Sequence, residues 1–378
     1  MKKKLLLFQL LVSFCVQSAP AQLTDGFYHI KNADTGRYLS INDTDPQNYK
    51  VNMQSGSVNL AGIRTYLNFD SVAVSPSCVI FVKQVGDGKY DLAGQGSSIY
   101  EMSNNRFTVN ISPAAGDTYI LSGTYSGFYK ELMDRSPSED DGYIMGSGNS
   151  GMNRWLFLPI NTTDEYIGIR PDVKTNNGGY FGTIYAGFNF KLASPGMAAF
   201  YVNNASGAGF TYEEIKDEVI PAGVPVIIRC NSANPVDNKI EPVAGSYDFN
   251  GNNFLGGEYC SLVGVAGHTN VTSYNPGTMR VLGISDKGDI AFINAKNRPE
   301  LLVVDKYGSQ YLRGNKAYLN VNPGDADVMT IGGSDGINDI KSETKASGIY
   351  TLTGIRLPEG TTPKAGVYIQ NGKKVIVK

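Results

Sequence analysis

The chain has 378 residues, with 33 Lys and Arg against 35 Asp and Glu, a formal net charge of −2, and two histidines. This nearly balanced charge, without a basic cluster, excludes the electrostatic footprint of a protein that binds nucleic acid or anionic lipid. The 44 Gly, 23 Tyr and 16 Phe, with only 18% charged residues, favour β-sheet with glycine turns.

The first 21 residues have the pattern of a secretory signal peptide. Three lysines precede an apolar run from Leu5 to Val16, and Ala19-Pro20-Ala21 supplies a cleavage site of small residues. A lipoprotein anchored at Cys15 is the second choice, because bulky Phe14 precedes that cysteine. No later run is long enough for a membrane helix. We therefore expect a mature chain of 30 basic and 35 acidic residues, secreted to the extracellular space or outer cell surface without a membrane span.

Residues 22–160 are predicted to form the first folded module. A strand with alternating pattern at Phe27–Ile30 leads through an Asp-Thr-Gly turn into a second strand at Tyr38–Ile41, which indicates a hairpin. Looser echoes of this unit begin at Tyr90 and Tyr119, so three units each open with Tyr-x-Ile or Tyr-x-Leu. Their spacing falls in the range that signals internal symmetry.

The stretch D-G-F-Y-H-I-K-N-A-D-T-G-R-Y-L-S-I of this module resembles the opening repeat of β-trefoil, ricin-B-like modules of secreted bacterial proteins. Lectin trefoils carry Gln-x-Trp near the end of each repeat, and Asn153-Arg154-Trp155 is the one comparable site here. The resemblance implies a three-fold β fold and carbohydrate binding.

Residues 161–330 are predicted to form a β-sandwich, because many short apolar stretches alternate with Gly, Asn and Pro. The stretch Thr211–Ile220 fits either a short helix or two strands, 211–215 and 219–220. We prefer the hairpin, since Pro221 follows at once. The order G-Y-F-G-T-I-Y, V-I-P-A-G-V-P-V-I-I, G-N-K-A-Y-L resembles an accessory β-domain of large surface proteins from Gram-negative gut and oral anaerobes.

The C-terminal part is predicted to be a polar linker, residues 331–347, followed by a small tail, residues 348–378. Asn371-Gly372 between alternating stretches predicts a tight hairpin. The segments I-Y-T-L-T-G-I-R-L, K-A-G-V-Y-I and K-K-V-I-V-K are similar to the C-terminal sorting tails of type IX secretion cargo. This resemblance implies that secretion machinery recognises the tail. The alternative is a plain terminal hairpin with basic edge protection.

The sequence offers little for catalysis or for a cofactor. His29 and His268 have no partner motif, and neither a zinc signature nor a phosphate-binding glycine loop is present. We therefore expect a non-catalytic protein without cofactor or metal. A glycoside hydrolase that uses paired carboxylates stays an alternative.

Two smaller questions stay open at this stage. Cys230 and Cys260 could form a disulfide or remain buried thiols. Carboxylates gather at two places and could hold calcium, but their spacing favours solvated loops. These carboxylates are Asp43, Asp45, Asp134, Glu139, Asp140 and Asp141.

Carbohydrate binding requires an aromatic face and convergent polar groups on the loops of a rigid scaffold. The residues that fit this requirement near the turns of the first and third repeats are Asp34, Arg37, Tyr38, Asn42, Tyr125 and Tyr129. We therefore expect a module that binds glycans or glycoproteins. A structural or adhesive surface protein that meets a protein partner is the main alternative.

Overall fold

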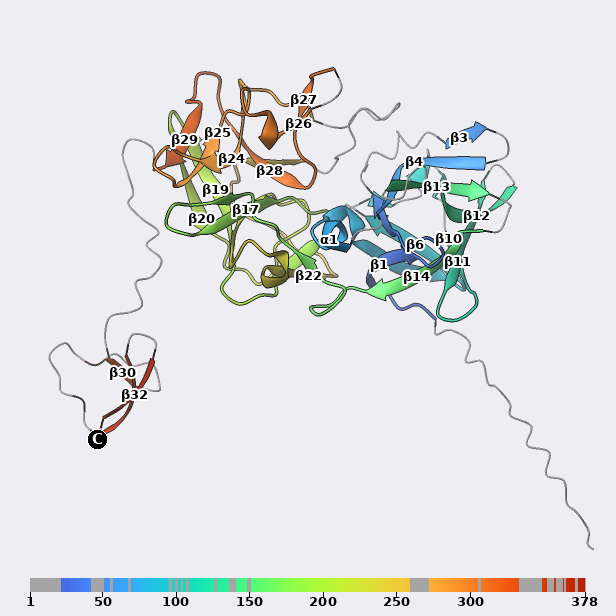
Figure 1. The fold of residues 1–378 in the computed structure, drawn as a ribbon, viewed down its shortest axis with the longest axis horizontal. Helices are drawn as coiled ribbons and strands as arrows, with labels where there is room; N and C mark the ends of the chain where they lie inside the picture. The colour runs from blue at the N-terminus through green and yellow to red at the C-terminus, as the bar shows by residue number, and fades with distance from the viewer. Residues whose placement is uncertain are drawn as a thin grey trace, which may run out of the picture. The chain divides into compact units, whose positions relative to one another are not determined.

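The computed structural model describes most of the chain between residues 22 and 377 (Figure 1). Its described ranges are 22–41, 51–54, 57–66, 69–94, 97–98, 101–102, 105–106, 109–125, 128–135, 141–147, 151–258, 272–304, 307–332, 349–351, 357, 363, 365–370 and 373–377. They divide into two compact units, Met1–Gly333 and Ser334–Lys378.

Nearly all regular structure is β-strand, so the all-β fold class is confirmed. Helical segments among the described residues are the short helix α1 (Phe69–Val72) and 3₁₀ turns at Pro76–Cys78, Pro235–Asp237 and Pro299–Leu301. Among these residues no helix has the length and apolar character needed to cross a membrane.

Six strands of the first module close into a ring. Pairing runs from β1 to β14, β11, β10, β6 and β5 and returns to β1, antiparallel throughout. The six strands are β1 (Gly26–Asn32), β5 (Ile80–Gly86), β6 (Lys89–Gly94), β10 (Val109–Pro113), β11 (Tyr119–Tyr125) and β14 (Arg154–Pro159). Each of the three sequence units contributes its first and last strand to this barrel, which is the arrangement of a β-trefoil.

The other strands of the module lie between the barrel strands in sequence. The ladder β2–β4–β13–β12 extends from β1 to β11 outside the ring. These strands are β2 (Tyr38–Ile41), β3 (Val51–Gln54), β4 (Ser57–Tyr66), β7 (Ser97–Ser98), β12 (Phe128–Arg135) and β13 (Asp141–Ser147), together with the separate pair β8 (Glu101–Met102) and β9 (Asn105–Arg106).

Each barrel strand sends two side chains, two positions apart, into one buried core. Alternate residues of a strand point to the same face, so this spacing lines the interior. The pairs are Tyr28 and Ile30, Ile80 and Val82, Tyr90 and Leu92, Val109 and Ile111, Tyr119 and Leu121, and Trp155 and Phe157. The repeated Tyr-x-Ile or Tyr-x-Leu motif is therefore the inward-facing pair that opens each repeat.

The second module is a ten-stranded sheet that folds over a core of its own, with Phe200, Phe210, Phe292 and Leu319 at its centre. A three-stranded sheet and a two-stranded sheet accompany it. In sequence order the strands are β15 (Ile167–Gly168), β16 (Val173–Lys174), β17 (Tyr180–Ile184), β18 (Asn189–Leu192), β19 (Ala198–Ser206), β20 (Gly209–Glu214), β21 (Val226–Cys230), β22 (Lys239–Val243), β23 (Leu255–Glu258), β24 (Met279–Ile284), β25 (Ile290–Ile293), β26 (Val303–Val304), β27 (Gln310–Tyr311), β28 (Lys316–Asn320) and β29 (Val328–Ile331).

The hairpin expected within Thr211–Ile220 is half wrong. Its first strand is present as β20, which pairs with β19 and β29. Ile220 instead forms a bridge with Phe190 of β18. Pairing with β18 satisfies both backbone groups of Ile220, because its N–H donates to the Phe190 carbonyl and its carbonyl accepts in return.

The two modules share a further core, which we call the seam. Val79 of the first module is buried in it, and Phe27 packs against it. The second module contributes Ile167, Ile169, Ile184, Ala186, Phe188, Phe190, Ala199, Ile220, Val226, Ile228, Cys230 and Ile240. The shared core explains why both modules belong to one compact unit. The boundaries 22–160, 161–330 and 331–347 stay sequence predictions.

The second unit contains a small antiparallel sheet of β30 (Ile349–Thr351), β31 (Gly366–Gln370) and β32 (Lys373–Val377). Gln370 pairs with Lys373, so β31 and β32 form the expected hairpin. Its connection, Asn371-Gly372, lies outside the described residues. The strand β30 adds a third member to the hairpin.

Candidate functional site

The polar residues expected to bind sugar in the first repeat are largely engaged by the protein itself. Asp34 accepts hydrogen bonds from the guanidinium of Arg154, with 2.9 Å between Asp34 Oδ1 and Arg154 Nε. Arg37 is buried and forms an ion pair with buried Asp134, at 2.7 Å between Arg37 Nη2 and Asp134 Oδ2. A buried arginine that loses its carboxylate partner is costly, so this pair serves the fold.

Tyr38 also lies inside the protein, with 5% of its surface exposed. Its ring packs against Phe69, and its hydroxyl donates to Glu165 Oε1 at 3.4 Å. Burial, followed by the nearby Glu165 carboxylate, raises the pKa of Tyr38 to about 12. A buried ring presents no face to a sugar, so the geometry does not favour Tyr38 as a binding residue.

Of the three remaining predicted residues, the structure describes the backbone of two. Asn42 lies outside the described residues. Tyr125 is the last residue of β11 and pairs with Phe128, while Tyr129 of β12 pairs with Thr124. The two tyrosines therefore lie close along one hairpin. Their role in binding stays a prediction.

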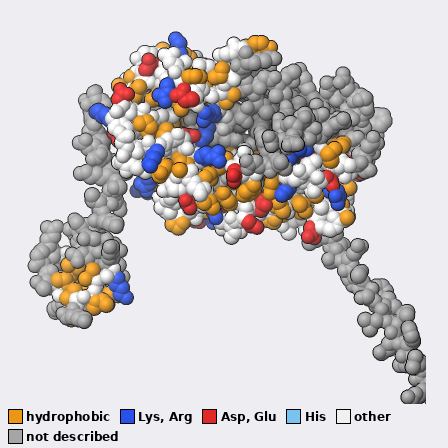
Figure 2. All heavy atoms as spheres, viewed as in Figure 1, with side chains coloured by type: hydrophobic (Ala, Val, Ile, Leu, Met, Phe, Trp, Pro, Cys, Tyr) orange, Lys and Arg blue, Asp and Glu red, His pale blue; other side chains and the backbone are white. Residues whose placement is uncertain are grey.

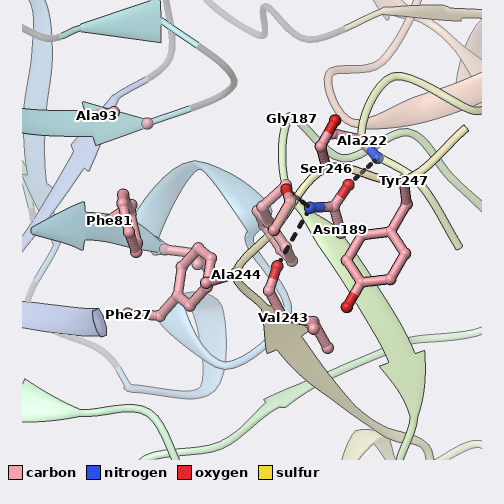
Figure 3. A pocket seen from close by; sticks show the side chains of 14 residues that line it. Phe27, Phe81, Ala93, Gly187, Asn189, Ala222, Val243, Ala244, Ser246 and Tyr247 are labelled. Carbon is pink, nitrogen blue, oxygen red and sulfur yellow. Dashed lines mark hydrogen bonds between the residues drawn. The ribbon is translucent and has the colours of Figure 1, made fainter. Parts of the chain in front are cut away.

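A cleft of about 410 Å³ opens along the seam between the first two modules (Figure 3). We call it the inter-module cleft. Strands β1, β5 and β6, with Val79 just before β5, supply one wall. The start of β18 with the two residues before it, the end of β22 with the segment after it, and Ala222 supply the other. The lining residues are Phe27, Val79, Phe81, Ala93, Gly94, Gly187, Phe188, Asn189, Ala222, Val243, Ala244, Gly245, Ser246 and Tyr247.

One end of the cleft is aromatic. The Phe27 and Phe81 ring centroids lie 4.9 Å apart with 48° between their planes. The Phe27 and Phe188 centroids lie 6.1 Å apart at 55°. Phe27 alternates with Tyr28 on β1, so its ring points to the seam while Tyr28 enters the barrel. The three tilted rings form a concave apolar corner.

The opposite wall is a loop held by one amide. Asn189 Nδ2 donates to the carbonyls of Val243 and Gly245, at 3.2 and 3.0 Å, and its Oδ1 accepts from the Ala222 N–H at 2.9 Å. Figure 3 shows Phe27 and Phe81 on one side of the cleft, with Asn189 and Tyr247 on the other. Asn189 therefore fixes the loop and keeps no free donor for a ligand.

The cleft offers hydrogen bonds without charge. Among the residues that the structure describes, none that lines the cleft is Asp, Glu, Lys, Arg or His. Ser246 and Tyr247 are exposed, and neither hydroxyl forms a hydrogen bond with another residue that the structure describes. An apolar corner facing a few hydroxyl and backbone groups suits a neutral polar ligand with one apolar side.

The structure describes only some of the residues that the sequence offered for metal binding or catalysis. Within the described ranges, no group of three His, Cys, Asp or Glu side chains is placed to hold a metal ion. Of the carboxylates weighed for calcium, Asp134 is paired with Arg37, and the side chains of the other five are not described. Cys230 is buried in β21, whereas Cys260 and His268 lie outside the described residues.

His29 has a structural position at the seam. Its Nδ1 lies 3.0 Å from Glu165 Oε2, and the ring is fully buried. Its Nε2 has no hydrogen-bond partner within the part of the chain that the structure describes. His29 and Phe27 share one face of β1, and both contact residues of the second module, Glu165 and Phe188 respectively.

On the face shown in Figure 2, Lys and Arg side chains are interspersed with Asp and Glu side chains. This mixture contrasts with the single-sign surface that binds a polyanion.

Comparisons with known proteins give a weak likeness to a solved structure. No protein-family model matches the chain, and no curated protein sequence matches it. Among solved structures, the chain is similar to the designed 3-fold symmetric protein ThreeFoil, with 17% identity, 35% of this chain and 99% of that chain covered, and a TM-score of 0.26. At these values the likeness adds nothing to the trefoil assignment, which rests on the closed ring of six strands and its core.

Sequence reasoning missed the cleft because its residues come from six separate stretches. Phe27 and Phe81 look like ordinary strand residues, and Asn189 and Tyr247 look like ordinary loop residues. One usable signal was present. Phe27 and Phe81 stand beside inward-facing barrel residues, so period-two alternation makes them outward-facing aromatics that need a second covering layer.

Proposed function

We propose that this is a secreted, non-catalytic carbohydrate-binding protein of the extracellular space or outer cell surface, and that sugar binds in the inter-module cleft. The signal-peptide pattern of residues 1–21 and the sorting-like tail, residues 348–378, support export. In this proposal the secretion machinery recognises the tail.

The uncharged aromatic cleft is the observation that carries the binding proposal. A sugar ring has an apolar C–H surface and a rim of hydroxyls, so it needs aromatic carbon on one side and hydrogen-bonding groups on the other. The half-buried Phe27 and Phe81 rings, backed by the buried Phe188, supply the first, and the Ser246 and Tyr247 hydroxyls supply the second.

The same lining favours binding of the sugar without catalysis. Glycoside hydrolysis requires two carboxylic acids flanking the bond to be broken, and the described lining contains none. The volume of about 410 Å³ lies at the small end of the usual range for ligand sites. A short saccharide terminus fits such a site better than a broad protein surface does.

A glycan array with the mature chain, residues 22–378, tests the proposal. Ala244→Trp places an indole in the cleft from an exposed position, so it should abolish binding while leaving the melting temperature unchanged. Ala115→Trp is the matched control, because Ala115 is also exposed, lies in the turn between β10 and β11 and does not line the cleft.

Binding that survives Ala244→Trp would place the sugar site elsewhere, with the Tyr125 and Tyr129 hairpin as the next place to examine. A folded protein that retains no glycan would leave the adhesive, protein-binding alternative in front.

A further inference from the structure

We infer that the inter-module cleft recognises a neutral terminal sugar through a methyl group on that sugar, as in a 6-deoxyhexose or an N-acetylhexosamine. The inference rests on the proposed carbohydrate-binding function and names the chemical class of ligand for that site.

The aromatic corner has the wrong shape for simple stacking. A sugar that stacks needs one exposed, flat ring face. Here Phe27 packs against Phe81 on one side and Phe188 on the other, at interplanar angles of 48° and 55°. Phe188 is itself buried, and Phe27 and Phe81 are half-buried. The rings therefore present a concave corner, which accommodates a small apolar group.

The rest of that wall is apolar and lacks bulk. Val79 and Ala93 line the cleft beside the three phenylalanines, and neither carries a side-chain hydrogen-bonding group. A hydroxyl directed into this corner would lose its water without gaining a partner, which is costly. A methyl group in the same place gains burial.

The far wall sets the polarity of the rest of the ligand. Ser246 and Tyr247 stand across the cleft from Phe27 and Phe81 and can exchange hydrogen bonds with ring hydroxyls (Figure 3). No described lining residue is charged, so nothing at this site would compensate for the desolvation of a carboxylate or an ammonium group. Acidic sugars and free amino sugars are therefore disfavoured.

Calorimetric titration of the mature chain with matched sugars tests the inference. Each pair differs at one methyl-bearing substituent: fucose against galactose of the same hand, rhamnose against mannose of the same hand, and N-acetylglucosamine against N-formylglucosamine, which lacks only the acetyl methyl. The first two pairs report a 6-deoxy methyl, and the third reports an acetyl methyl. We expect the methyl-bearing member of at least one pair to bind roughly tenfold more tightly. Saturation transfer in NMR should be strongest at its methyl protons.

Two variants locate the effect. Ala93→Leu fills the corner from a half-buried position and should remove the preference within each pair while weak binding through the hydroxyls persists. Phe81→Ala should do the same by removing one wall. Val85→Ala is the control, because Val85 lies on the same strand as Phe81, is 48% exposed and does not line the cleft.

The outcomes separate the inference from the proposal beneath it. Equal binding of both members of every pair, blocked by Ala244→Trp, would overturn the methyl inference and leave carbohydrate binding intact. A preference for the methyl-bearing sugar that survives Ala93→Leu and Phe81→Ala would also overturn it. No binding of any sugar by the folded chain would overturn both.

Discussion

Strand β1 serves two regions of the molecule in opposite ways. Tyr28 and Ile30 point into the barrel, where all six strands contribute equivalent pairs. Phe27 and His29 point away from the barrel, and each contacts a residue of the second module, Phe188 and Glu165 respectively. The barrel repeats itself three times, whereas the seam has no internal symmetry.

This difference explains which region of the molecule leaves space for a binding site. A ring of six strands with two inward side chains each fills its interior, and the polar residues nearby close into pairs such as Arg37 with Asp134. At the seam the surfaces of two modules meet, and the cleft of about 410 Å³ opens there. Binding sites commonly occur at such junctions.

Replacing Trp155 by Ala should produce the largest effect on the barrel. Trp155 is 1% exposed, and its Nε1 donates to the Leu132 carbonyl at 3.0 Å. Loss of the ring and its hydrogen bond should lower the free energy of unfolding by about 4–5 kcal/mol. The matched change at the seam, Phe190→Ala, removes an equally buried ring. Denaturant melts of both variants will show whether barrel and seam unfold together, and separate transitions would mean that the seam does not couple the modules.

Breaking the buried ion pair should have the next largest effect on the free energy of unfolding. Arg37→Ala leaves the Asp134 carboxylate buried without that partner, and we expect a loss of about 3–4 kcal/mol in the free energy of unfolding. Replacing both Arg37 and Asp134 by Leu should recover most of this loss. The same melts measure both variants. If Arg37→Ala changes stability no more than an exposed substitution, the pair is not the internal contact described here.

The seam contact of His29 should give a smaller change. Glu165→Gln keeps the size of the side chain but removes the carboxylate that meets His29 Nδ1 at 3.0 Å and the Tyr38 hydroxyl at 3.4 Å. We expect a loss of roughly 1–2 kcal/mol, measured by chemical unfolding at neutral pH. An unchanged midpoint would show that apolar contacts alone hold the seam at this point.

Alkaline pH should affect stability through Tyr38. A phenol becomes charged when it loses its proton, and burial raises the pKa of Tyr38 from 10.0 to about 12. The folded state therefore keeps the proton longer than the unfolded state, so this stabilisation is complete below pH 10 and is lost as pH rises through 12. Tyr38→Phe should reduce the loss of stability between pH 10 and pH 12. Thermal melts measure this stability, and phenolate absorbance measures the ionisation of the tyrosines. Tyr212→Phe in the second module is the comparison, because burial also raises the pKa of Tyr212 to about 12.

The exposed pair of Asp34 with Arg154 should matter least. Water screens this pair, and Arg154 is largely exposed, so Asp34→Ala should move the melting temperature only slightly. A large drop would mean that the turn depends on this contact. Unchanged glycan binding by the same variant would remove Asp34 from the predicted site.

How much of the candidate site the sequence could predict depends on the residue. The turn chemistry around Asp34 and the strands on either side were readable, because hairpins are local. The burial of Arg37 was not readable, since Asp134 lies 97 positions away in the chain. The cleft was beyond reach for the same reason, because Phe27, Phe81, Asn189 and Tyr247 meet only after both modules have folded.

The sequence by itself determined the all-β class and the three Tyr-led units, because period-two alternation and turn residues act over a few neighbouring positions. Only the tertiary structure decided which aromatic side chains are buried in a core and which line the cleft. Tyr38 entered a buried cluster, whereas Phe81 reached the cleft. That choice depends on which surfaces meet across the seam, and such contacts join residues far apart in the chain.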